Sequence, residues 1–127
     1  MKIRVYYEDT DEQGVVYHSN YLNYCERARS EIFFQKNVDI FSKEFYFVVK
    51  NLTADFKNSA KLGDIIEIKT RLIEIKRASL KLEQRVFRDD EEIFTLELLL
   101  VSMSKKTSFQ ASTQPFPHSM SCFPKAI

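Results

Sequence analysis

The sequence predicts an α+β domain in which one long helix is covered by a curved antiparallel sheet. Apolar residues recur at three- and four-residue spacing over residues 19–37, which is typical of an amphipathic helix. Three later runs, residues 65–76, 78–88 and 92–103, alternate apolar and charged side chains as half-buried strands do. The order of elements is therefore a strand, a helix and then successive strands.

The first strand and the helix flank an acidic loop. Ile3, Val5 and Tyr7 occupy every second position, which indicates a strand with one buried face. The helix is expected to start at Ser19 or Asn20, both good N-cap residues, and to run for roughly 25 Å. Its predicted buried stripe consists of Tyr21, Leu22, Tyr24, Cys25, Ala28, Ile32 and Phe33.

The second half of the chain predicts long strands joined by turns. Residues 38–44 show no clear period and are expected to form a loop or a short helical turn. A long strand over 45–56 follows, and its alternation slips once near Lys50 and Asn51, as a β-bulge would require. Residues 58–64 predict a turn. The two edges of such a sheet would be exposed, which favours pairing with a second copy.

Composition narrows the possible functions. The 127 residues, 44% of them hydrophobic, suit one globular domain, and a net charge of +1 offers no broad attraction for nucleic acid. No apolar run approaches the roughly 18 residues of a membrane span, and no signal region opens the chain, so a cytoplasmic protein is expected. The two cysteines have no metal-ligand spacing and are expected to be reduced.

The last residues differ in composition from the rest. From Ser104 onward the chain has no Asp or Glu and contains all of its prolines. We therefore expect a domain over 1–103 and an atypical tail over 104–127, loosely packed because of its composition; an altered C-terminal sequence is the alternative.

The acidic loop before the helix concentrates the candidate chemistry. Gly14, one of only two glycines, allows a tight turn that would deliver Asp11 close to the helix N-terminus. The unpaired N–H groups of a first helical turn can polarise a carbonyl oxygen, and a carboxylate beside them can attack the carbonyl carbon or deprotonate a water. The pattern is compatible with attack on a carbonyl carbon, but a solvated acidic surface loop explains it as well, because Glu8, Asp9 and Glu12 surround Asp11.

This segment resembles the active-site segment of hot-dog-fold acyl-CoA thioesterases, and is most similar to their YbgC-type branch. The residues that match the pattern are Tyr7, Thr10, Asp11, Gly14, Val16 and Tyr21. The resemblance implies a hot-dog fold, hydrolysis of acyl-CoA without a metal or other cofactor, and a homodimer or dimer of dimers. It also implies that Asp11 acts as nucleophile or general base, that His18 polarises the carbonyl through its backbone N–H, and that Tyr7 hydrogen-bonds within the site.

Substrate-binding residues are expected at strand ends and turns. If coenzyme A is part of the substrate, its phosphates need surface cations, and Lys57 and Arg77 could supply them. Their uncharged neighbours Asn58 and Ser79 are expected to bind the substrate beside them. Lys61 and Lys76 are in similar places. A solvated basic rim explains these residues equally well, and an acyl carrier protein could replace coenzyme A as the carrier.

Other interpretations of the same residues are weaker. The run from Asp9 to Gly14 mimics the start of an EF-hand, but Gln13 and Asn20 stand where calcium ligands are needed. Cys25 lies seven residues from His18, about 10 Å along a helix, so the two cannot share a proton. A non-catalytic binding module for acyl thioesters or acyl carrier protein remains the alternative from another class, and a hot-dog dehydratase the alternative enzyme.

Overall fold

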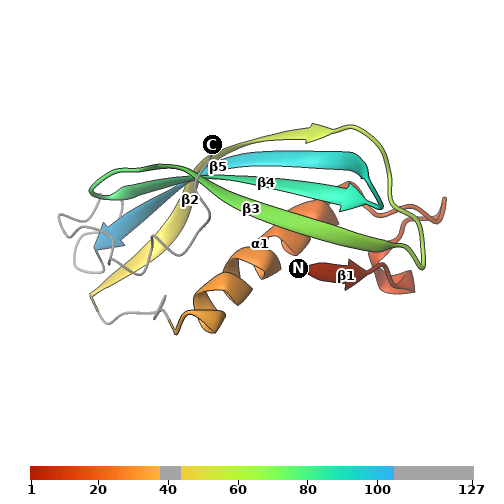
Figure 1. The fold of residues 1–127 in the computed structure, drawn as a ribbon, viewed down its shortest axis with the longest axis horizontal. Coiled ribbons are helices and arrows are strands. Elements are labelled where there is room, and N and C mark those ends of the chain that lie inside the picture. Colours follow the sequence, from red (N-terminus) through yellow and green to blue (C-terminus); the bar gives the residue numbers. More distant parts are fainter. Residues whose placement is uncertain (38–43, 105–127) are drawn as a thin grey trace.

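The computed structural model of the chain describes residues 1–37 and 44–104. They form one antiparallel sheet in the order β1-β3-β4-β5-β2 and one long helix, α1, which lies across one face of the sheet (Figure 1). A short 3₁₀ helix, η1, lies between β1 and α1. The bounds are β1 Lys2–Arg4, η1 Tyr7–Asp9, α1 His18–Gln35, β2 Phe45–Phe56, β3 Ile65–Ile75, β4 Ser79–Arg88 and β5 Glu91–Ser104.

The helix buries the stripe that its periodicity predicts. Tyr21, Tyr24, Cys25, Ala28 and Phe33 are buried, and they share one apolar core with alternate residues of β3, β4 and β5. The predicted two-layer arrangement of helix and sheet is confirmed. The N-terminal turn of α1 is thereby held against one end of the sheet, where the acidic loop also lies.

The core contains one polar crosslink between the layers. Gln84 on β4 is fully buried and donates from Nε2 to the carbonyl oxygen of Cys25 at 2.8 Å and to Oγ1 of Thr70 at 3.0 Å. Its Oε1 accepts a hydrogen bond from Arg29 at 2.8 Å. Because each polar atom of a buried amide needs a partner, this glutamine fits one placement of the helix on the sheet.

Several boundaries follow the sequence closely. The register of β2 against β5 shifts between Val49 and Asn51, which confirms the predicted bulge. The turn before β3 contains Gly63 at a φ of 89°, and Asp89 turns the chain between β4 and β5 at a φ of 53°. The loop predicted over 38–44 falls mainly on residues 38–43, and the predicted tail on 105–127, both outside the described residues.

Two predictions about the N-terminal region were wrong. The first strand ends at Arg4, and Tyr7 belongs to η1 with its side chain 82% exposed, so it does not continue the buried face of a strand. The helix begins at His18 with Tyr17 as its N-cap, so Ser19 and Asn20 lie inside the first turn. In both places hydrogen bonds to Asp9 determine the conformation, as described below.

The sheet has two open edges. β1 has three residues and leaves most of β3 unpaired on its outer side within the described part of the chain. β2 is the other edge strand, and it exposes Val49, Leu52 and Phe56 by 42–51%. Large apolar side chains on an exposed edge favour association with another strand. Within the described residues, no helix is both long enough and apolar enough to cross a bilayer.

Core packing predicts the outcome of a matched pair of truncations. Leu80 on β4 is completely buried, whereas Leu62 in the turn before β3 is 51% exposed. We expect Leu80→Ala to lower the free energy of unfolding by about 2–5 kcal/mol, because it leaves a cavity. Leu62→Ala should lower it by less than about 0.5 kcal/mol. Urea unfolding followed by circular dichroism measures both, and equal losses would contradict the described core.

Candidate active site

The acidic loop is a small hairpin that packs on the rest of the fold. Thr10 and Val16 form an isolated bridge, and the Asp11 N–H donates to the carbonyl oxygen of Val15 at 2.9 Å. Gly14 turns the chain at a φ of 78°, which a glycine adopts without strain. A second bridge joins Val15 to Lys61 in the turn before β3. The loop is therefore anchored at its base and on one side.

The carbonyl oxygen of Asp9 joins this hairpin to the start of α1. It accepts the backbone N–H of Tyr17 and the side-chain amide of Asn20, each at 2.9 Å. The Asp9 carboxylate accepts the N–H of Tyr6 at 2.9 Å, which closes η1. These bonds explain why the helix begins at His18, since the chain is already held at Tyr17. They also hold the Asp11 loop beside the first helical turn.

The Asp11 carboxylate is oriented by the backbone of its own loop. Oδ1 accepts the N–H of Gln13 at 2.8 Å and, more weakly, that of Val15 at 3.4 Å. Within the described residues, Oδ2 has no hydrogen-bond partner. One carboxylate oxygen is therefore fixed by the backbone, while the other is available to a substrate or a water.

His18 is the first residue of α1, so its backbone N–H has no partner inside the helix. Its imidazole is exposed and lies beside the Tyr17 ring, with centroids 4.4 Å apart, and edge-on to Phe56, with centroids 6.4 Å apart. Phe56 ends the edge strand β2. The positive end of the helix thus opens beside both the Asp11 loop and an open sheet edge.

The structure places Tyr7 next to this loop but gives its ring no hydrogen bond to Asp11. The carbonyl oxygen of Tyr7 accepts the N–H and the hydroxyl of Thr10, at 3.1 and 2.8 Å. These bonds make Tyr7 part of the scaffold of the loop. The predicted role of its hydroxyl in the site stays a prediction.

Two buried tyrosines of α1 lie between the core and the segments that hold the loop. The Tyr21 hydroxyl accepts the N–H of Ala60 at 3.0 Å, and its ring stacks on Phe94 with centroids 5.1 Å apart. Burial raises the pKa of Tyr21. Burial, and then the nearby Asp9 carboxylate, raise the pKa of Tyr24. The buried ring of Tyr21 thus joins the helix to the turn before β3 that contacts the loop.

Lys57 and Asn58 lie at the same end of the sheet as the loop, and acidic residues already contact them. Lys57 pairs with Glu92, and the Asn58 side chain donates to Glu91 at 2.8 Å. The hydrogen bond from Asn58 is the main cause that lowers the pKa of Glu91, and the hydrogen bond from Lys57 is the main cause that lowers the pKa of Glu92. A phosphate would have to compete with Glu92 for Lys57.

The structure does not bring Arg77 and Ser79 to Asp11 within one chain. Ser79 begins β4 and pairs with Val101 near the end of β5, whereas the Asp11 loop lies at the other end, beside the turn before β3. β4 has ten residues, so the two ends are separated by about 33 Å. The four predicted substrate-binding residues therefore form two pairs at opposite ends of the sheet.

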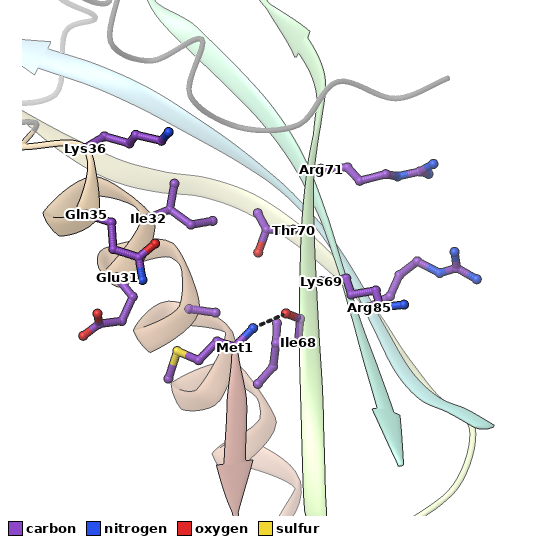
Figure 2. A pocket seen from close by; sticks show the side chains of 11 residues that line it. Met1, Glu31, Ile32, Gln35, Lys36, Ile68, Lys69, Thr70, Arg71 and Arg85 are labelled. Carbon is purple, nitrogen blue, oxygen red and sulfur yellow. Dashed lines mark hydrogen bonds between the residues drawn. The ribbon is translucent and has the colours of Figure 1, made fainter. Parts of the chain in front are cut away.

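A large groove lies elsewhere, between the C-terminal half of α1 and β3. Its volume is about 590 Å³, and Met1, Ile32, Ile68 and Thr70 gather in it (Figure 2). The Met1 ammonium donates to the carbonyl oxygen of Ile68 at its lower end (Figure 2). None of its lining residues belongs to the Asp11 loop.

The competing candidate chemistries find little support in the described part of the chain. No three His, Cys, Asp or Glu side chains gather there closely enough to hold a metal ion. Cys25 is fully buried, and burial raises the pKa of its thiol to about 12. The thiol is therefore a core group and a poor nucleophile.

Sequence reasoning did not identify the polar group formed by Gln84 and Arg29. Gln84 shares the inward face of β4 with the buried apolar residues Leu80, Leu82 and Val86, and a polar residue at that position is the signal that could have identified it. Arg29 reaches it from the helix.

Comparisons with known proteins agree with one another. The model of the family described as "Thioesterase superfamily" matches residues 13–95. The acyl-CoA thioesterase YbgC of Helicobacter pylori is 51% identical over 87 residues, which cover 68% of this chain and 65% of that protein. The acyl-CoA thioester hydrolase YbgC of Escherichia coli O157:H7 is 34% identical over 102 residues, or 78% of this chain and 76% of that protein. A probable thioesterase from Bartonella henselae superposes with a TM-score of 0.81 at 27% identity, covering 92% and 97% of the two chains.

Burial of Cys25 predicts a thiol that does not react in the native protein. In a Cys122→Ser variant, whose only thiol is Cys25, the raised pKa reduces the thiolate fraction at pH 8 by about three orders of magnitude relative to an exposed cysteine. We expect Ellman's reagent to release colour only after urea is added. Rapid labelling without urea would contradict the buried position of Cys25.

Proposed function

The chain belongs to the thioesterase superfamily and has the hot-dog fold, and from this premise we propose that it hydrolyses acyl-CoA thioesters. The matched stretch covers 65% of the length of the Helicobacter pylori relative. The names of both YbgC relatives state acyl-CoA thioester hydrolysis. The products would be a free carboxylic acid and coenzyme A.

One observation carries this proposal. The Asp11 carboxylate has one oxygen fixed by backbone N–H groups and the other available, and its loop is tied to the first turn of α1. A thioester carbonyl bound there would receive the His18 N–H on its oxygen. The helix end would stabilise the negative charge that develops as the carbonyl carbon is attacked.

The reaction can proceed with the groups of this loop and water. Oδ2 of Asp11 either attacks the carbonyl carbon or removes a proton from a water that attacks it. The C–S bond then breaks, and the thiolate of coenzyme A leaves and takes up a proton. In the first case a water hydrolyses the resulting anhydride and restores Asp11. We propose that no metal or redox cofactor takes part, and that coenzyme A enters only as part of the substrate.

Two copies would be needed to complete the substrate site. If two β2 edges pair antiparallel about a two-fold axis, the Phe56 end of one strand lies beside the Phe45 end of the other. The Asp11 loop of one copy then approaches the end of the second copy that carries Arg77 and Ser79. This arrangement would unite residues that lie about 33 Å apart in one chain, and it supports a homodimer or a pair of such dimers.

A cytoplasmic location and an acyl carrier protein as a possible alternative carrier belong to the same proposal. An acyl carrier protein fits a site that recognises a thioester on a phosphopantetheine arm, because coenzyme A and acyl carrier protein share this group.

The role of Asp11 predicts the effect of a nearly isosteric change. Asp11→Asn keeps an oxygen that can accept from Gln13, so the loop should remain folded, but it removes the negative charge. We expect the rate of thiol release to fall by about 10²–10⁴-fold. Glu12→Gln, which makes the same change at the exposed neighbouring residue, should retain activity within about twofold.

Circular dichroism shows whether both variants fold, and acyl-CoA binding is measured in parallel. If the wild type binds acyl-CoA but releases no thiol, the protein is a binding module. If Asp11→Asn retains full turnover, Asp11 is not the catalytic residue.

A site shared between two copies predicts complementation. Asp11→Asn and Arg77→Ala should each be weakly active alone. A dimer with one chain of each kind contains one complete site, formed by Asp11 of one chain and Arg77 of the other. We expect activity to rise after the two variants are mixed, unfolded and refolded together. Activity no higher than the mean of the separate variants would show that each site lies within one chain.

A further inference from the structure

Arg29 is a partly buried cation without a described counter-ion. Its Nη1 donates to Oε1 of Gln84 at 2.8 Å, and it takes part in none of the ion pairs among the described residues. Burial lowers the pKa of its guanidinium. Glu26 precedes it by one helical turn, but the two side chains form no ion pair. A partly buried cation is costly unless an anion reaches it, and none of the described residues supplies one in an ion pair.

Arg29 lines a small cleft between α1 and β2. The cleft has a volume of about 200 Å³, and its walls include the aromatic residues Phe33, Tyr46 and Phe47. Glu26 lines the same cleft. Because Tyr46, Phe47 and Val49 belong to the edge strand, the cleft is continuous with the open edge of β2. A chain that pairs with this edge would also cover the cleft.

Two-fold symmetry determines which residues meet across such an interface. In two antiparallel helices related by a two-fold axis, residue i of one faces residue c − i of the other, where c is a constant. If the axis passes near the middle of the segment from Glu26 to Arg29, which line the same cleft, each glutamate lies opposite the arginine of the other copy. The charges are complementary, and the symmetry forms the pair twice.

We propose that the cleft beside Arg29 takes the Glu26 side chain of a second copy, and that the two reciprocal ion pairs hold the dimer together. The inference rests on the two-copy site of the proposed function, and it names the residues that make the contact. Each guanidinium would then have two partners, Gln84 of its own chain and the partner subunit's Glu26. The β2 edges and α1 would form one continuous interface.

Charge reversal tests this pairing. Glu26→Lys places two cations at each contact, and Arg29→Glu places two anions there. We expect each variant alone to raise the dissociation constant of the dimer by roughly thirtyfold or more. In an equal mixture, the introduced lysine of one chain meets the introduced glutamate of the other, and the native Arg29 and Glu26 meet at the second contact. Mixed dimers should therefore form with near wild-type affinity. Sedimentation velocity measures the affinity, and native mass spectrometry identifies the mixed dimer.

Matched controls separate this effect from misfolding. Arg27→Glu makes the same charge change at an exposed residue of the same helix that does not line the cleft, and it should leave the dimer unchanged. If Arg29→Glu does not fold, Arg29→Met replaces it. Arg29→Met and Glu26→Gln should then weaken the dimer to a similar degree, and combining them should add little.

Two results would overturn the inference. One is a dimer whose affinity does not respond to either charge reversal, and the other is a mixture that dimerises no better than its components. Thiol release is measured on the same samples. If the dimer releases thiol but its affinity does not depend on Arg29, the proposed function holds and this interface is wrong. If its affinity responds to the charge reversals but no thiol is released, the interface holds and the proposed function is wrong.

Discussion

The structure depends on one constraint, the placement of α1 on the sheet. Gln84 is buried in the middle of this contact, and its amide is satisfied only where Cys25, Thr70 and Arg29 surround it. A shift of the helix by one turn would leave buried polar groups unpaired, at a cost of about 1–3 kcal/mol each. The placement of the helix also determines where its N-terminus lies. The Asp11 loop is bonded to that end, so the geometry of the candidate site follows from the packing of the core.

The features that the sequence predicts correctly are those that depend on periodicity. The buried stripe of α1, the alternation of the strands and the bulge near Lys50 all appear as periodic patterns of apolar residues. They do so because each side chain of a helix or strand faces either the core or solvent. The N-cap was misplaced because Tyr17 is held by the Asp9 carbonyl, eight residues earlier, and no local preference reveals that bond. Tyr7 was wrongly assigned to a buried strand face. The alternation of apolar residues does not reveal the hydrogen bond from the Tyr6 N–H to the Asp9 carboxylate, which turns the chain into η1.

Some features of the candidate site could be predicted from the sequence, and others could not. The Asp11 loop could be predicted, since its glycine, its acidic residues and the start of a helix lie together in the sequence. The pairing of Lys57 with Glu92, and the distance between Asp11 and Arg77, could not be, because both depend on the register of strands far apart in the chain. The contact of Arg29 with Gln84 joins residues 55 positions apart. The sequence already favours a second copy through its exposed sheet edges, but only the tertiary fold shows which residues lie too far from Asp11 to share a site with it in one chain.

We propose that two copies of this chain hydrolyse acyl-CoA thioesters at the Asp11 loop. The most direct measurement is thiol release from short, long and aromatic acyl-CoA esters over a series of protein concentrations. If only the dimer is active, the rate of thiol release per chain rises with protein concentration and levels off as dimers form. Absence of thiol release from every ester at every concentration, or a rate per chain that is constant down to a demonstrated monomer, would contradict it.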